Sequence, residues 1–148
     1  MGRVSTELGQ RIYIDTNIVI YAVEGLAHYA AQVQPLLDAM DAAEVFVVTS
    51  EFTLAEALVG PLKTQNLSIQ QIYRSFLTSS AILEVVPVSR AILEDSAQLR
   101  ATTKLKLPDA IHLATALQHQ CDSFLTNDVV FKSLNLAQVK MLSDVDFT

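Results

Sequence analysis

The stretch RIYIDTNIVIYA at residues 11–22 decides the fold of this 148-residue chain. Its first four residues, Arg11–Ile14, are mostly apolar and β-branched, which predicts a short buried strand. The polar tripeptide Asp15-Thr16-Asn17 then interrupts the apolar pattern, and the apolar run over residues 18–22 predicts a helix. We therefore expect the chain to begin as a strand, a polar turn and a helix.

The same alternation continues to the end of the chain. Gly60-Pro61 is expected to end one of the helices, and Ser68 is expected to cap the next. Strands that alternate with helices predict an α/β fold in which a central parallel sheet carries helices on both faces. We expect a flexible lead-in over residues 1–10 and one domain over 11–148, with strands at 45–48, 82–88, 123–126 and 139–142 and helices at 29–43, 51–59, 68–80, 89–103, 108–120 and 129–134.

The composition limits the classes of function that the chain can have. No run of about 18 apolar residues is present, so the sequence predicts no membrane span. The single cysteine, Cys121, predicts no internal disulfide and a reducing cytoplasm as its setting. The net charge of −6 argues against a broad phosphate-binding face, so any nucleic-acid function must depend on bound cations and a few lysines or arginines. Only 18% of the residues are charged, which suggests that a partner covers some apolar surface.

Four acidic residues occupy positions that a parallel sheet would bring together. Asp15 follows the first strand, Asp128 follows the fourth, Glu56 lies in the helix after the second strand, and Asp109 lies in the first turn of a later helix. Ligands of such sheets bind beyond the carboxyl ends of the strands. Four neighbouring carboxylates repel one another without a counter-ion, and hard divalent cations such as Mg²⁺ or Mn²⁺ suit oxygen ligands. The chemistry that this set supports is metal-assisted hydrolysis of a phosphodiester.

Each acid taken alone also has a structural explanation. Asp15 and Asp128 could be turn residues, Asp109 could complement the helix dipole, and Glu56 could be a solvated helix position. Against this, Glu56 and Asp109 lie in the tracts LAEAL at 54–58 and LPDAI at 107–111, whose apolar and small residues are unusual neighbours for a surface acid.

The segments around the four acids resemble those of the PIN-domain nucleases, especially the small VapC-like toxins of type II toxin–antitoxin pairs. The matching segments are IDTN at 14–17, TSEFTLAE at 49–56, LPDAIHLATA at 107–116 and LTND at 125–128. They occur in the family's order and span nearly the whole chain, so together they are far more specific than any one of them.

The resemblance implies a three-layer α/β/α sandwich, Mg²⁺ or Mn²⁺ as cofactor, an RNA substrate, a homodimer and a cognate antitoxin. It implies that the four acids are metal ligands, with Glu56 binding through water. It also implies that four polar neighbours orient these acids by hydrogen bonds: Thr16, Asn17, Thr126 and Asn127.

Other side chains near the acids have more than one interpretation. The basic residues nearest to the acids in sequence, Lys104, Lys106 and Lys132, could bind RNA phosphates or could simply be solvated. His112 is expected to pack or to form hydrogen bonds rather than to react. Tyr21 and Tyr73 could stack on bases, although core packing is the expected role of both.

Three rival functions are consistent with parts of the sequence. A phosphatase of the haloacid dehalogenase type needs a second acid two residues after the first, where Asn17 stands. An enzyme that acts on structured DNA usually carries extra DNA-binding segments, for which 148 residues leave little room. A non-toxic PIN-fold module that binds or processes RNA remains the main alternative.

Overall fold

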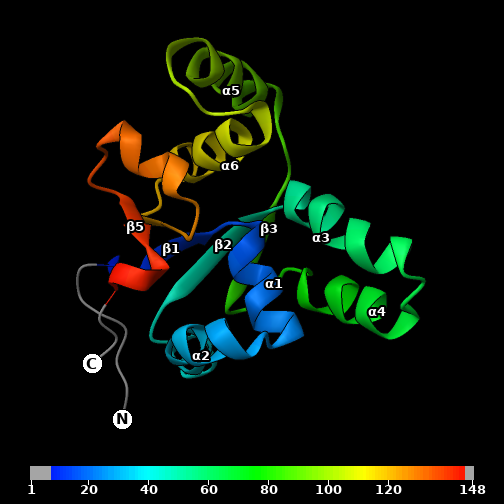
Figure 1. Ribbon diagram of the computed structural model, residues 1–148. Helices are drawn as coiled ribbons and strands as arrows, with labels where there is room; N and C mark the ends of the chain where they lie inside the picture. The colour runs from blue at the N-terminus through cyan, green and yellow to red at the C-terminus, as the bar shows by residue number, and fades with distance from the viewer. Residues whose placement is uncertain (1–7, 146–148) are drawn as a thin grey trace.

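A central parallel sheet organises the computed structural model, which describes residues 8–145 (Figure 1). Its five strands lie in the order β3-β2-β1-β4-β5, and every pairing is parallel. This confirms the predicted fold class. The strands are β1 (Arg11–Ile14), β2 (Phe46–Ser50), β3 (Leu83–Val86), β4 (Ser123–Thr126) and β5 (Val139–Met141).

Helices cover both faces of the sheet, as Figure 1 shows. The pair α5 and α6 lies on one side, and α1, α2 and α4 lie on the other, with α3 packed against α1 and α4. The helices are α1 (Thr16–Glu24), α2 (Ala27–Asp41), α3 (Glu51–Lys63), α4 (Leu67–Phe76), α5 (Arg90–Thr102) and α6 (Leu107–Gln118), with 3₁₀ segments η2 (Val129–Leu134) and η3 (Leu142–Asp144).

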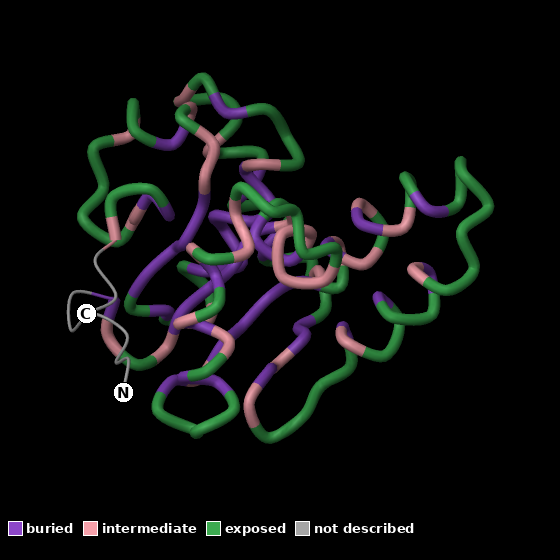
Figure 2. Tube along the Cα trace, turned by 60° about the horizontal axis from the view of Figure 1, so that its bottom comes forward, coloured by how far each residue is buried: buried purple, intermediate pink, exposed green. Residues whose placement is uncertain are grey.

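Alternate side chains of β1 build the core on the two faces. Ile12 and Ile14 pack beneath α1 and α2, whereas Tyr13 packs on the α6 side against Phe124 of β4. Figure 2 shows the buried residues concentrated along the strands at the centre of the molecule. Because β1 is buried on both faces and pairs with β2 on one side and β4 on the other, its carboxyl end lies in the middle of one edge of the sheet.

The expected break at Gly60-Pro61 is wrong, because α3 continues to Lys63. Pro61 is buried in the last turn of the helix, where its ring removes one backbone hydrogen bond. Its carbonyl accepts hydrogen bonds from the Asn66 amide at 2.9 Å and from Gln70 Nε2 at 3.1 Å. Packing of α3 against α4 therefore offsets the cost of the proline.

The following helix begins earlier than expected. The N-cap of α4 is Asn66, whose side chain accepts a hydrogen bond from the Ile69 amide, and not Ser68. Tyr73 is fully buried and its hydroxyl donates to Glu24 of α1, so the core-packing role expected for Tyr73 is confirmed. Ile72 of the same helix is 46% exposed.

The predicted lead-in over residues 1–10 lies mostly outside the described residues. At its end, Leu8 is fully buried and its carbonyl accepts a hydrogen bond from Ser123 Oγ at 2.5 Å. The backbone amides of Gln10 and Arg11 donate to the carboxylate of Asp122. These contacts attach the start of β1 to the start of β4.

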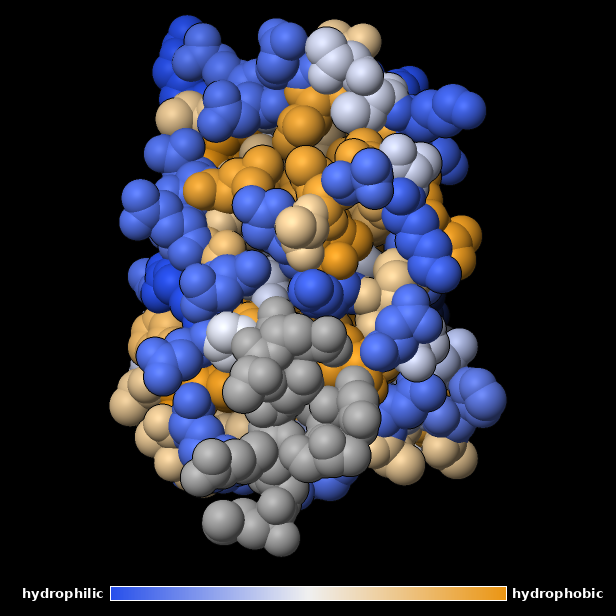
Figure 3. All heavy atoms as spheres, turned by 90° about the vertical axis from the view of Figure 1, so that its left-hand side faces the viewer, coloured by the Kyte–Doolittle hydropathy of each residue, from blue (hydrophilic) through white to orange (hydrophobic). Residues whose placement is uncertain are grey.

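A shallow groove of about 320 Å³ opens at the β5 edge of the sheet. Its lining includes Lys132, Lys140, Met141 and Asp144, and none of the four predicted site acids. On this side of the molecule, hydrophobic residues are exposed among hydrophilic ones (Figure 3). Over residues 8–145, no helix combines the length and apolar character that crossing a membrane requires.

The continuation of α3 through Gly60 leads to a stability prediction. Gly60 is exposed within the helix, and apart from its chain neighbours and the backbone of its own helix, a Cβ at this position would meet no atom within 4 Å. The variant Gly60→Ala should therefore stabilise the fold by only up to about 0.5 kcal/mol, because alanine loses less backbone entropy in a helix but its Cβ is crowded by the ring of the following Pro61. Thermal denaturation should show a melting temperature raised by up to about 2 °C.

The matched comparison is Gly25→Ala. A Cβ at Gly25 is equally free of contacts, but Gly25 has a φ of +59°. This variant should lower the melting temperature, since L-residues are strained in that region. If both variants shifted the melting temperature in the same direction, the assignment of Gly60 to a regular helix would be wrong.

Candidate active site

Asp15 lies at the junction of β1 and α1, at the carboxyl edge of the sheet. It is the N-cap of α1, and its Oδ1 accepts a hydrogen bond from the Ile18 amide at 3.3 Å. Only 6% of Asp15 is exposed. A carboxylate is rarely this buried unless its neighbours or a bound ion compensate its charge.

Thr126, the last residue of β4, connects Asp15 to Asp128. Its hydroxyl donates to Asp15 Oδ2 at 2.5 Å and accepts from the Asp128 amide at 3.1 Å. Asp128 in turn caps η2, because its Oδ1 accepts a hydrogen bond from the Val130 amide at 3.0 Å. The pairing of β1 with β4 thus brings together two acids that are far apart in the sequence.

Glu56 reaches the same region from α3 and is held by two other elements. Its Oε1 accepts a hydrogen bond from Thr16 Oγ1 at 2.5 Å and lies 2.6 Å from Nε2 of His112. The other ring nitrogen of His112, Nδ1, lies 2.6 Å from the hydroxyl of Tyr13. A neutral imidazole that donates from Nε2 to Glu56 and accepts at Nδ1 from Tyr13 satisfies both contacts. His112 is buried with both nitrogens engaged, which confirms its expected hydrogen-bonding role.

Asp109 completes the set from the first turn of α6. It is half-buried, and burial is the main cause that raises the pKa of its carboxyl. The negative charge of Asp128 raises this pKa further, and the charge of Glu56 adds to it, whereas His112 and Lys106 act in the opposite direction. These couplings mean that the acids of α3, α6 and the β4 end share one electrostatic environment.

Burial is the largest influence on the pKa values of the site acids. It raises the pKa of Asp15 to about 6, against the hydrogen bond from Thr126, the charge of His112 and the hydrogen bond from Ile18, and the charge of Asp128 contributes to the increase. Burial also acts to raise the pKa of Glu56, but the hydrogen bonds from His112 and Thr16 outweigh it and leave this pKa lowered.

The donor set is suited to a hard divalent cation, although it does not form a closed cage. Over residues 8–145, no three acidic, histidine or cysteine side chains stand close enough together to hold an ion as they are placed. The carboxylates are instead turned toward hydrogen-bond donors such as Thr126 and His112. Within the described part of the chain, all hydrogen bonds to the Glu56 side chain fall on Oε1, which leaves Oε2 available for a water or an ion. Oxygen donors and excess negative charge are what Mg²⁺ and Mn²⁺ require.

The four polar residues expected to orient the acids differ in what they contact. Thr126 bonds to Asp15, whereas Thr16 bonds to Glu56. Asn127 donates to the hydroxyl of Tyr21 at 3.4 Å. Asn17 is exposed, and its side chain has no hydrogen-bond partner among residues 8–145.

Sequence reasoning missed the role of Tyr13. Its alternating position in β1 indicates only that it packs in the core, which it does against Phe124. The only available signal was a hydroxyl in an otherwise apolar strand, since a buried tyrosine usually finds a partner for it. That partner is His112, at a distance of 99 residues along the chain.

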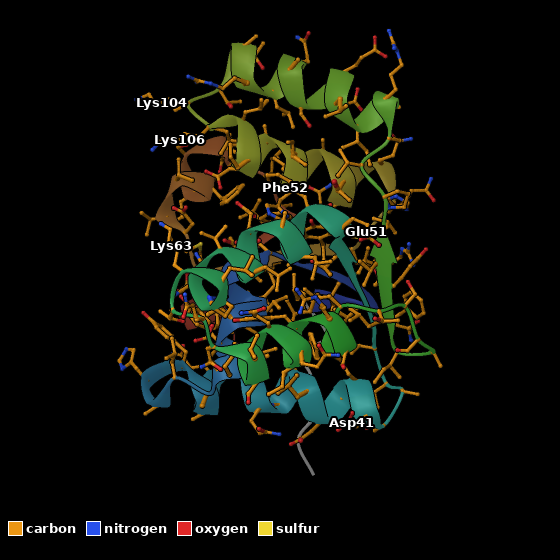
Figure 4. All side chains as sticks on the ribbon, turned by 90° about the vertical axis from the view of Figure 1, so that its right-hand side faces the viewer. Asp41, Glu51, Phe52, Lys63, Lys104 and Lys106 are labelled. Atoms are coloured by element: carbon orange, nitrogen blue, oxygen red, sulfur yellow. The ribbon has the colours of Figure 1, made fainter. Side chains whose placement is uncertain are left out.

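Lysines are present on one side of the site. Lys104 and Lys106 are exposed just before and at the N-cap of α6, and Figure 4 shows Lys63 of α3 on the same side of the molecule. Lys132 lies elsewhere, since its Nζ is 3.9 Å from Asp144 and it lines the groove at the β5 edge.

Comparisons with known proteins agree with the fold described above. The sequence model of a family described as PIN domain matches residues 12–135. A toxin-antitoxin complex from Klebsiella pneumoniae contains a chain that is 30% identical, with a TM-score of 0.67, and the match covers 88% of this chain and 97% of that one. No protein with a curated description matches.

Two further solved structures share the fold at lower identity. The toxin VapC20 from Mycobacterium tuberculosis, described as cleaving the sarcin-ricin loop, is 14% identical with a TM-score of 0.71, and the match covers 87% of this chain and 98% of that one. VapBC2 from Rickettsia felis, bound to a DNA fragment from its promoter, is 19% identical with a TM-score of 0.68, and the match covers 93% of this chain and 100% of that one.

The raised pKa of Asp15 predicts how stability depends on pH without metal. Between about pH 4 and pH 6 the folded state holds a proton on Asp15 that the unfolded state has lost, so the free energy of unfolding falls as the pH rises. The loss is on the order of 2–3 kcal/mol. In EDTA, Asp15→Asn should remove most of this fall, because asparagine keeps the N-cap and carries no charge.

Urea denaturation at pH 4.5 and pH 7 measures this difference. The matched control is Asp41→Asn, a substitution at an exposed position at the end of α2, which should behave like the wild type. Parallel pH dependence in the wild type and Asp15→Asn would show that Asp15 titrates normally.

Proposed function

The chain belongs to the PIN-domain family of nucleases, and from this premise we propose that it is an endoribonuclease that hydrolyses RNA phosphodiester bonds with bound Mg²⁺ or Mn²⁺. The observation that carries the proposal is that hydrogen bonds and electrostatic coupling link acids from four separate elements at the carboxyl edge of β1 and β4. Asp15 is buried at this edge although it carries a carboxylate, which fits a site that normally contains a cation.

Asp15, Asp109 and Asp128 would bind the metal directly, and Glu56 would bind it through water. A divalent ion supplies positive charge for the scissile phosphate and lowers the pKa of a bound water. The protein's own hydrogen bonds set the positions of the acids. Thr126 holds Asp15, whereas Thr16 and His112 hold Glu56, so these side chains keep the acids in place before substrate arrives.

An acidic enzyme can bind RNA only if the repulsion between like charges is offset locally. The net charge of the chain is −6. The metal provides part of the compensation, and the exposed Lys104 and Lys106 next to Asp109 provide cationic contacts for the RNA backbone. The proposed phosphate contact of Lys132 and the proposed orienting roles of Asn17 and Asn127 rest on the sequence, because within residues 8–145 none of these three side chains bonds to a site acid.

We also propose that the protein is a homodimeric toxin of a toxin–antitoxin pair that acts in the cytoplasm. The complex from Klebsiella pneumoniae supports the antitoxin partner. The helical hairpin of α3 and α4 supports a further protein contact, since it exposes four large apolar side chains. They are Val59, Leu62, Leu67 and Ile72, and their exposed fractions are 50%, 51%, 75% and 46%.

Replacing the acids by their amides tests the proposed chemistry. Asp15→Asn, Asp109→Asn and Asp128→Asn should each reduce RNA cleavage by at least about 100-fold, since the amide keeps the shape and removes the charge that the ion requires. Glu56→Gln should have a smaller effect if Glu56 binds through water. Cleavage of a labelled RNA in Mg²⁺ or Mn²⁺, with and without EDTA, provides the measurement.

The matched control is again Asp41→Asn, which should cleave like the wild type. The amide variants should remain folded, and Mn²⁺ should raise the melting temperature of the wild type more than that of the variants. EDTA-resistant cleavage by Asp109→Asn would place the catalytic site elsewhere.

The contribution of the lysines appears in the salt dependence of RNA binding. The double variant Lys104→Ala/Lys106→Ala should weaken binding and reduce the slope of log Kd against log salt by about 1.4, which corresponds to two phosphate contacts with a single strand. The charge-matched control is Arg74→Ala/Lys140→Ala, which removes two positive charges at α4 and at the groove of the β5 edge. An equal change in slope for both pairs would refute a specific phosphate contact at the start of α6.

A further inference from the structure

Three aromatic side chains form a cluster beside the acids, where α1 passes into α2. The rings of Tyr21 and Tyr29 are stacked, with centroids 4.0 Å apart and planes 15° apart. The ring of His28 meets Tyr29 edge-on, with centroids 4.8 Å apart and planes at 82°. We refer to Tyr21, His28 and Tyr29 as the aromatic ledge.

The turn between the two helices creates the ledge. Gly25 is the C-cap of α1 with a φ of +59°, and its amide bonds to the carbonyl of Tyr21. The next helix begins at once, and the Tyr29 amide donates to the carbonyl of Leu26 at 2.8 Å. This left-handed turn reverses the chain, so the first turn of α2 lies against the last turns of α1.

The ledge is connected to the acidic site at its inner end. The hydroxyl of Tyr21 accepts a hydrogen bond from Asn127, the residue directly before Asp128. Tyr21 also lies on the helix that Asp15 caps. Burial raises the pKa of Tyr21, and the charge of Asp15 contributes to the increase, so the phenol lies within electrostatic reach of that acid.

Core packing accounts for only part of the ledge. Tyr21 packs against the core, but Tyr29 belongs to none of the three clusters that form the core of the described residues. His28 is exposed and Tyr29 is partly exposed. Tyr73 shows the contrast, because it is fully buried and its hydroxyl is bound to Glu24. His28 and Tyr29 therefore keep exposed surface that a ligand can reach.

We propose that the aromatic ledge stacks an unpaired base of the RNA and thereby places the neighbouring phosphodiester at the acids. This inference rests on the proposed ribonuclease function. Stacking on aromatic rings is a general means of holding single-stranded nucleic acid, and it tolerates different bases because each has a π-face. A base within a duplex has both faces covered, so the ledge selects single-stranded regions or loops as substrate.

The experiment separates stacking from polarity and bulk at one position. Tyr29→Leu removes the ring and keeps an apolar side chain, whereas Tyr29→Phe keeps the ring and removes only the hydroxyl. The matched control is Phe46→Leu, the same loss of a ring at the start of β2, which pairs with the start of β1 at the opposite edge of the sheet from the acids. Each variant is made in the wild type for kinetics and in Asp109→Asn for binding without cleavage.

Two measurements apply to every variant. One is the KM and kcat for cleavage of a short single-stranded RNA in Mn²⁺. The other is the fluorescence of 2-aminopurine placed in the same RNA, which falls when this base stacks on a ring. Tyr29→Leu should raise KM and Kd by about tenfold, within the range known for loss of one stacking contact, and should lose the fluorescence quenching. Its kcat should change little, because the ledge binds the ground state and the transition state equally.

Tyr29→Phe and Phe46→Leu should match the wild type in KM, Kd and quenching. If the wild type cleaves the RNA and Tyr29→Leu has the same KM and the same quenching as the wild type, the stacking role of the ledge is wrong. The ribonuclease function would then still stand. Failure of the wild type to bind or cleave RNA would overturn both proposals. An RNA hairpin with a fully paired stem and the 2-aminopurine in that stem should show no quenching, and equal quenching there would also refute the stacking role.

Discussion

The hydrogen bond from Thr126 to Asp15 is the interaction on which the arrangement of this site depends. It joins the end of β4 to the end of β1 at the middle of the sheet, and the same hydroxyl receives the amide of Asp128. One threonine therefore fixes the relative positions of two acids that belong to different elements. A buried carboxylate also needs such a donor, because its charge has lost most of its hydration.

Asp15 contributes to the fold and, under the proposed function, to the chemistry as well. Its side chain caps α1, so the helix begins where β1 ends. Because Tyr21 of the aromatic ledge lies on the same helix, the position of this cap also sets the position of the ledge. The acid is also electrostatically strained, since burial raises its pKa to about 6. A residue that stabilises a helix and at the same time destabilises its own charged form is typical of a functional site. Binding of the proposed cation would remove this conflict and leave the cap in place.

Much of this structure could be predicted from the sequence, and the exceptions have physical causes. The parallel α/β fold follows from the alternation of elements, and the positions of Asp15 and Asp128 follow from the ends of β1 and β4. Local rules failed at Gly60-Pro61, because packing between α3 and α4 outweighs the helix-breaking tendency of that dipeptide. The contact of His112 with Tyr13 could not be predicted either, since it joins residues whose proximity depends on how α6 packs over the sheet.

The order in which the chain is synthesised has a consequence for the same central strands. Asp15 and Thr126 are separated by 111 residues. In the sheet, β1 pairs with β2 on one side and with β4, which is synthesised much later, on the other. A nascent chain can complete β1, α1 and β2 early, but contacts of such long sequence separation form only after the intervening loop closes. A chain that terminates before β4 lacks both the hydroxyl that donates to Asp15 and the acid Asp128. Under the proposed function, the complete acidic site therefore forms only after residues 123–128 have been synthesised and have paired with β1.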